Sequence, residues 1–214
     1  MDITWLGHAA IRLRARDAAV VMDPTDKSDG NDMGRPQGEI VTVSHHHPHH
    51  DHVAGVRGEV MVLDGPGEYE ISGIHIEGLR AALRPATNQD PAALRSTIFI
   101  FETEELRLAH LGGLSAPPTA QQAEHLSNLD VLFVPVGCDE ALTPDQAARV
   151  TRALEPHIAI PIAYEPAKRG MPAALQTFLQ QLGVTPEAAV SRATLNRRTV
   201  GGDGTRVMLL ESRG

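Results

Sequence analysis

Histidines are concentrated in one short segment of this chain. Six of its 11 histidines lie between positions 45 and 52, in the run His45-His46-His47-Pro48-His49-His50-Asp51-His52. Neutral imidazoles bind zinc and similar metals, and a catalytic zinc takes about three protein ligands and keeps one position open. A β-rich run ends at Ser44, and residues two apart in an extended chain point the same way, so His45 and His47 can converge on one point. This pattern indicates a metal site; the alternative is a solvated loop that takes up metal adventitiously.

The elements that must position these histidines differ between the two halves of the chain. The first half predicts short strands separated by turns, several with alternating apolar and polar residues. These strands are expected over Asp2–Leu6, Ile11–Arg14, Ala19–Asp23, Ile40–Ser44, Glu59–Leu63, Ile74–Gly78, Ile98–Glu102 and Leu106–Leu111. Gly65-Pro66-Gly67 predicts a turn.

The second half predicts helices interleaved with buried strands. Thr119 with Gln122, and Thr143 with Gln146, form capping boxes that begin two helices. A third helix is expected over 172–182, ending at Gly183. Strands are expected over Val131–Pro135, Ile158–Pro161 and Val207–Leu210, and residues 184–205 are expected to be irregular. Strands first and helices later favour stacked sheets with helices on their outer faces.

Composition limits the classes of function. The 214 residues suit one domain over 1–214, and the single cysteine, Cys138, excludes an internal disulfide framework and fits a reducing compartment. The acidic start is unlike a signal peptide, and no apolar run approaches the ~20 residues of a membrane span, so we expect a cytoplasmic protein with no membrane partner. A net charge of −8 argues against a nucleic-acid partner and leaves a small molecule as the expected ligand.

Several motifs in chain order resemble landmarks of the metallo-β-lactamase superfamily, with the greatest likeness to the ascorbate-6-phosphate-lactonase-like zinc-dependent hydrolases. They are Trp5-Leu6-Gly7-His8-Ala9, Met22-Asp23-Pro24, Ser44-His45-His46-His47, Gly65-Pro66-Gly67-Glu68-Tyr69, His110-Leu111-Gly112, Val134-Pro135-Val136-Gly137 and Ile160-Pro161-Ile162. The resemblance implies an α/β (α+β) fold, the four-layer αββα sandwich. It also implies that two metals share a hydroxide, which attacks a lactone, ester or phosphodiester.

The same resemblance implies roles beside the metal for three further residues. Asp23 is expected to orient a metal ligand, while His8 and Tyr164 are expected to line the cleft. A turn role for Asp23 and His8, and a packing role for Tyr164, are the alternatives.

Two registers fit the family motif of S-H-x-H-x-D-H. Counted from the end of the strand, the metal ligands are His45, His47, His49 and His50, with His49 at the aspartate position. A register two residues later reads His47-Pro48-His49-His50-Asp51-His52 and satisfies the motif fully. We prefer the first register, because the spacing from Ser44 to Gly65-Pro66-Gly67 leaves no room for an insertion. Asp51 and His52 are therefore secondary candidates.

Three more ligand positions implied by the family carry residues that cannot bind metal. Leu83 and Ala163 stand where histidines are expected, and Gly113 stands where the bridging aspartate is expected. We therefore predict an inactive or altered homologue that forms no dinuclear site and holds one zinc or other divalent metal at most, or none. No catalytic residue is assigned. The alternative is a mononuclear hydrolase of a small lactone or phosphoester that uses the His45–His50 cluster, with Glu68 or Glu165 as an added ligand.

Overall fold

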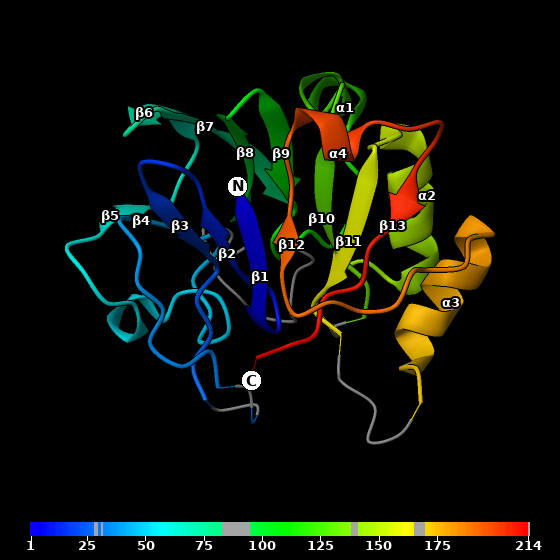
Figure 1. The fold of residues 1–214 in the computed structure, drawn as a ribbon, viewed down its shortest axis with the longest axis horizontal. Coiled ribbons are helices and arrows are strands. Elements are labelled where there is room, and N and C mark those ends of the chain that lie inside the picture. Colours follow the sequence, from blue (N-terminus) through cyan, green and yellow to red (C-terminus); the bar gives the residue numbers. More distant parts are fainter. Residues whose placement is uncertain (28–29, 31, 83–94, 138–140, 165–169, 214) are drawn as a thin grey trace.

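Two β-sheets stacked face to face form the centre of the protein (Figure 1). A computed structural model describes residues 1–214 except 28–29, 31, 83–94, 138–140, 165–169 and 214. The six-stranded sheet has the order β12-β1-β2-β3-β4-β5, and the seven-stranded sheet has the order β13-β11-β10-β9-β8-β7-β6. This arrangement confirms the expected α/β class and the sandwich of sheets.

The strands of the six-stranded sheet are β1 (Asp2–Gly7), β2 (Ala10–Arg14), β3 (Ala19–Met22), β4 (Ile40–Thr42), β5 (Met61–Leu63) and β12 (Ala193–Thr194). Those of the other sheet are β6 (Gly67–Ile71), β7 (Ile74–Ala82), β8 (Arg95–Thr103), β9 (Leu106–His110), β10 (Val131–Pro135), β11 (Ile158–Ile162) and β13 (Arg206–Val207). The helices are η1 (Val53–Gly55), α1 (Ala120–His125), α2 (Pro144–Leu154), α3 (Ala173–Leu182) and α4 (Arg197–Val200). Among the described residues, none of the helices is long and apolar enough to span a membrane.

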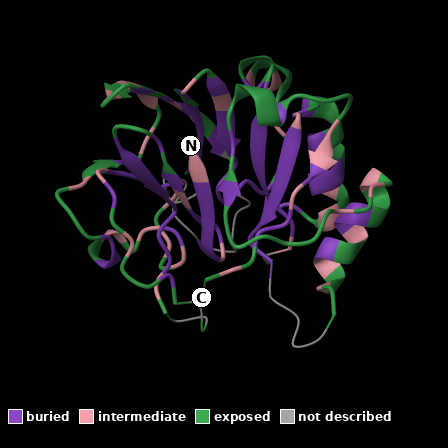
Figure 2. Ribbon diagram, in the orientation of Figure 1, coloured by how far each residue is buried: buried purple, intermediate pink, exposed green. Residues whose placement is uncertain are grey.

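The main core lies between the sheets, where the strands are buried along most of their length (Figure 2). Aromatic residues make up only 3% of the chain, yet all four phenylalanines are fully buried: Phe99, Phe101, Phe133 and Phe178. A smaller cluster covers the outer face of the six-stranded sheet, where Met33 and Val56 from loops pack on Leu6, Val21 and Val41. This outer layer is built from loops and the short helix η1, whereas α2 and α3 pack side by side next to the other sheet (Figure 1).

Both predicted capping boxes are present, since Thr119 and Thr143 each accept a hydrogen bond from the backbone of the predicted glutamine. The third helix ends as predicted, with Gly183 in the left-handed conformation at φ 73°. Three expectations were wrong. Gly67 begins strand β6 instead of completing a turn, and the stretch expected to be irregular contains β12 and α4. The predicted last strand, Val207–Leu210, is instead the two-residue strand β13, and Leu210 forms only an isolated bridge with Val190.

The ends of β1, β3, β4, β9 and β11 lie at one edge of the sandwich. Backbone contacts join the segments that follow these strands: Asp23 N donates to Thr42 O (2.8 Å), and Ala163 N donates to His8 O (2.9 Å). The histidine-rich segment follows β4 directly, so the fold delivers it to the same edge.

Candidate metal centre

Five imidazole rings gather at this edge: His8, His45, His47, His49 and His50, which we call the histidine cluster. Ring centres lie 4.1 Å apart for His45 and His50, and 4.6 Å apart for His47 and His49. His8 lies 5.0 Å from His50 and 5.2 Å from His49. The structure thus brings together the four histidines of the preferred register and adds His8, whose proximity the sequence indicated only through a family resemblance.

The three other polar residues of the segment have different contacts: they are His46, Asp51 and His52. His46 is exposed, and its Nδ1 lies 3.5 Å from the carboxylate of Asp51. His52 is exposed at the start of η1, with its ring against Gly55. Among the described residues, the side-chain contacts found for Asp51 and His52, the residues that distinguish the second register, are thus with His46 and Gly55.

Asp23 is fully buried and is hydrogen-bonded to Ser44 and to His50 of the cluster. Its Oδ1 accepts a hydrogen bond from Ser44 N (2.7 Å), and its Oδ2 accepts from Ser44 Oγ (2.6 Å) and from His50 Nδ1 (2.7 Å). Burial alone would raise the pKa of this carboxyl, but His50, followed by His110 and His45, more than offsets burial and holds the pKa below its ordinary value. Asp23 therefore stays ionised, and His50 is oriented with Nε2 as its other nitrogen.

Ser44 extends this network to His45. Because Ser44 Oγ donates to Asp23, it can accept from His45 Nδ1, which lies 3.0 Å away. This arrangement puts the His45 proton on Nδ1 and leaves Nε2 as the basic nitrogen. Burial, and to a smaller extent the nearby His50, lowers the pKa of His45 to about 3. His45 is thus neutral at physiological pH, the form in which imidazole binds metals.

His8 is fixed by its backbone at the end of β1. Its carbonyl accepts from Trp5 Nε1 (2.7 Å) and from Ala163 N (2.9 Å), and its φ of 47° lies in the left-handed region. Burial lowers the pKa of His8 to about 3, and His50 and His49 act in the same direction. His8 is therefore a second neutral imidazole at this edge.

The positions implied as lost ligands have distinct surroundings. A Cβ atom placed on Gly113 would lie 2.4 Å from Cε1 of His45, so the ring of His45 occupies the space next to this glycine. Ala163 adopts a φ of 53°, a left-handed conformation that costs an alanine free energy. Leu83, Glu165 and Cys138 lie outside the described residues.

The other candidates do not extend the cluster. Glu68 is exposed on the edge strand β6. Tyr164 is 8% exposed with its ring 4.8 Å from that of Trp5, and burial raises its pKa to about 12. His110 is fully buried and donates from Nε2 to Ala9 O (2.9 Å). Within the part of the chain that the structure describes, no three His, Cys, Asp or Glu side chains are already arranged around one metal position.

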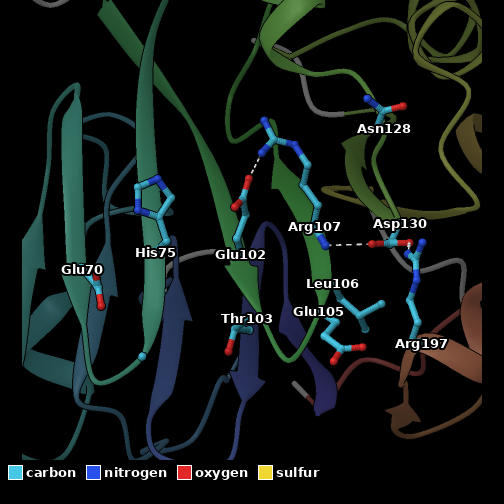
Figure 3. Close-up of a pocket in the computed structure, with 11 residues that line it drawn as sticks. Glu70, His75, Glu102, Thr103, Glu105, Leu106, Arg107, Asn128, Asp130 and Arg197 are labelled. Atoms are coloured by element: carbon cyan, nitrogen blue, oxygen red, sulfur yellow. Dashed lines mark hydrogen bonds and ion pairs between the residues drawn. The ribbon is translucent and has the colours of Figure 1, made fainter.

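A wide hollow of about 740 Å³ lies at the opposite end of the sheets and contains none of these residues (Figure 3). Glu70, His75, Glu102 and Arg107 face one another in a row across β6, β7, β8 and β9. Arg107 pairs with Glu102, and Arg197 pairs with Asp130 at 2.7 Å. The size of this hollow therefore does not identify the chemical site, which the histidine chemistry places at the other end.

Comparison with known proteins defines the class. Residues 2–163 match the family described as the beta-lactamase superfamily domain, so the chain belongs to that family and the resemblance seen in its motifs is confirmed. The chain is similar to a Thermotoga maritima protein described as a Zn-dependent hydrolase of the metallo-β-lactamase superfamily, with 28% identity, a TM-score of 0.78 and 99% of each chain covered. It is also 25% identical to a UPF0173 metal-dependent hydrolase from Methanopyrus kandleri, over 89% of this chain and 96% of that protein.

Proposed function

We propose that this protein binds one divalent transition-metal ion in its histidine cluster and does not form the dinuclear centre that the family resemblance implies. The position of His45 is the observation that carries this proposal. Its ring fills the space into which a side chain at position 113 would extend, so a bridging carboxylate has no room there. The relatives described as metal-dependent hydrolases support the metal, and the altered ligand positions argue against a pair of metals.

The donors are of the right chemistry for a single ion, but the rings would first have to turn toward a common point, since no three of the described side chains already surround one position. His45, His47, His49 and His50 would supply the donors, and zinc is the expected ion because imidazole suits it. Such an ion would act as a Lewis acid and lower the pKa of a bound water. Asp23 and Ser44 hold His50 and His45 with their Nδ1 atoms engaged, which directs Nε2 of each ring to the metal side.

The carboxylate of Asp23, which contacts the cluster through His50, is not available for proton transfer. Asp23 is fully buried and accepts three hydrogen bonds, so it orients His50 but does not act as a base. The mononuclear hydrolase of a small lactone or phosphoester would need another base, and Glu165 is the candidate that follows Tyr164 in the sequence.

Elemental analysis tests this proposal on protein prepared without an affinity tag or metal column. We expect one equivalent of metal per chain after loading with zinc and removal of excess ion. Two tightly held equivalents would overturn the single-metal proposal, and no retained metal would overturn metal binding. Zinc-dependent turnover of lactone or phosphoester substrates by one-equivalent protein would establish the mononuclear hydrolase in place of an inactive homologue.

A further inference from the structure

Strand β5 (Met61–Leu63) forms one edge of the six-stranded sheet, and no other strand of the described residues lies on its outer side. Met61 N donates to the segment before β4, and Leu63 O accepts from the segment after it, each at 2.9 Å. Because backbone groups alternate in direction along a strand, Val62 directs its N–H and C=O away from β4. Such outward groups are a template for pairing with another extended chain.

The side chains of β5 leave apolar surface uncovered at this edge. Met61 is 52% exposed and Val62 is 41% exposed, and they are two of the four large apolar side chains exposed in the described part of the chain. Met61 is in register with Ile40 of the core between the sheets. Val62 is in register with Val41 of the smaller cluster on the outer face. An added strand would therefore extend both apolar layers by one row.

Acidic residues border this apolar edge. Glu59 and Asp64 flank β5, and Glu68 lies on β6, the edge strand of the other sheet at the same side of the sandwich (Figure 1). All three are exposed, and none forms an ion pair with a described residue. Arg57 is the nearest arginine or lysine along the chain, and its Nε donates to Arg35 O. The border therefore favours basic groups on a chain that lies against β5.

We propose that β5 binds an extended segment of a partner protein as an added strand, and that this segment is apolar in its centre and carries Lys or Arg at both ends. Main-chain hydrogen bonds to Val62 supply affinity, while the apolar contacts and the acidic border supply specificity. Only three residues of β5 pair with β4, so the contact is small and the binding is weak and reversible. This inference does not depend on the bound metal.

A second copy of this chain fits the same edge less well. Pairing of two β5 strands would bring the carboxylates of Glu59 and Asp64 from both copies into one short interface, and residues 59–64 contain no Lys or Arg. Like charges placed in this way oppose pairing. Strand β6 is a poorer template, because Glu68 and Glu70 are both exposed along it and charged side chains protect edge strands from pairing.

The test measures binding of a blocked synthetic peptide, Lys-Lys-Val-Thr-Val-Thr-Val-Lys-Lys, to the full chain by isothermal titration in chelator. One matched peptide replaces the valines by proline and keeps the charge, and the other replaces the lysines by glutamate. We expect only the first peptide to bind, and to bind more weakly at high salt. Hydrogen exchange followed by NMR should show that the Val62 amide is slowed on binding, whereas the Met61 amide, already bonded in the free protein, changes little.

Val62→Pro removes the outward N–H. Proline is tolerated on an edge strand where its N–H would face solvent, so the hydrogen bonds to β4 are kept. We expect this variant to bind the first peptide about 5-fold or more weakly, which corresponds to the loss of at least one hydrogen bond. Val62→Thr is the matched control, because it keeps the amide and a β-branched side chain, and its affinity should stay close to that of the wild type.

Several results would overturn the inference. Absence of binding by the first peptide, or an unchanged affinity in Val62→Pro, would exclude an added strand at β5. Equal binding of the valine and proline peptides would show attraction between charges alone. A wild-type dimer in sedimentation that Val62→Pro dissociates would show that a second copy occupies the edge instead. If circular dichroism shows that Val62→Pro is unfolded, the double variant Glu59→Gln/Asp64→Asn replaces it: weaker binding with a smaller salt dependence would support the inference, and unchanged binding would overturn it.

Discussion

Gly113 and His45 illustrate how a single residue pair can decide the chemistry of the site. The imidazole of His45 fills the volume beside Gly113, and hydrogen bonding through Ser44 ties this ring to the buried carboxylate of Asp23. The ring cannot move toward solvent without breaking that connection. A side chain at position 113 would therefore compete with the His45 ring for the same space.

Replacing Gly113 by alanine should destabilise the metal-free protein. The new Cβ would lie 2.4 Å from His45 Cε1, so the ring must shift, and overpacking of this kind costs about 1–3 kcal/mol. Denaturation by urea in chelator measures the free energy of unfolding. Gly65→Ala is the matched control, because a Cβ there meets no atom within 4 Å. Equal stability of the two variants would show that His45 is free to move.

The sequence predicted the histidine cluster better than its surroundings. His45, His47 and His49 are half-buried while His46 is exposed, as expected for an extended segment. The strand ends earlier than expected, at Thr42, and a turn closed by His50 N donating to His47 O brings the rings together instead. The contact of His45 with Gly113 joins segments far apart in the chain, and no local pattern encodes it. The same holds for His8, which the backbone of Ala163 helps to fix.

At the scale of elements, the hairpin between β8 and β9 carries unusual turn residues. Glu104 and Glu105 connect Thr103 to Leu106 and have φ values of 50° and 61°. Two-residue hairpin turns of this kind favour Asn and Gly, because both central residues have positive φ. Glu104 has a compensating contact, since its carboxylate accepts from Arg16 N at 2.8 Å. Among the described residues, the Glu105 side chain forms no hydrogen bond or ion pair of this kind, and it lines the hollow at this end.

Glu105→Gly should stabilise the protein. Removing the side chain relieves the left-handed strain, which we expect to raise the free energy of unfolding by about 1 kcal/mol after the entropy of glycine is counted. Chemical denaturation at neutral pH measures the change. Glu70→Gly on β6 is the control: the same substitution within a strand should lower stability by roughly 0.5–1 kcal/mol. A loss of stability in Glu105→Gly would contradict the argument from strain.

Elements with a strong local signal were predicted, and those fixed by distant partners were not. Val131–Pro135 was predicted to the residue, because a short apolar run between turn signals specifies a buried strand. β12 has only two residues, and its pairing with Asp2 and Ile3 at the start of the chain creates it. Helix α4 is a single turn capped by Asn196. Such elements arise from tertiary contacts, which override local preference.

At the scale of the whole molecule, the two sheets together bury several imidazoles beside one carboxylate. His8 and His45 are held neutral with pKa values of about 3, mainly by burial. In the unfolded chain these groups would titrate near their ordinary value of about 6.5. Folding therefore prevents protonation of both rings over several pH units, and stability must depend on pH.

The metal-free protein should lose stability as the pH falls from about 6.5 toward about 3. Above this pH range His8 and His45 are unprotonated in both the folded and the unfolded state, so these rings contribute no pH dependence. Within this range only the unfolded chain binds protons at the two rings, so acidification favours unfolding. We expect the thermal midpoint in chelator to fall by about 10 °C between about pH 7 and about pH 4.

His8→Asn should reduce this fall, because one of the two buried imidazoles is gone, whereas His46→Asn should leave it unchanged. A midpoint that does not vary over this range, or a fall that is the same in His8→Asn, would show that the fold does not exclude protons from His8. Because protons and metal compete for the same nitrogens, bound zinc should oppose the loss of stability until the pH is low enough to displace the ion.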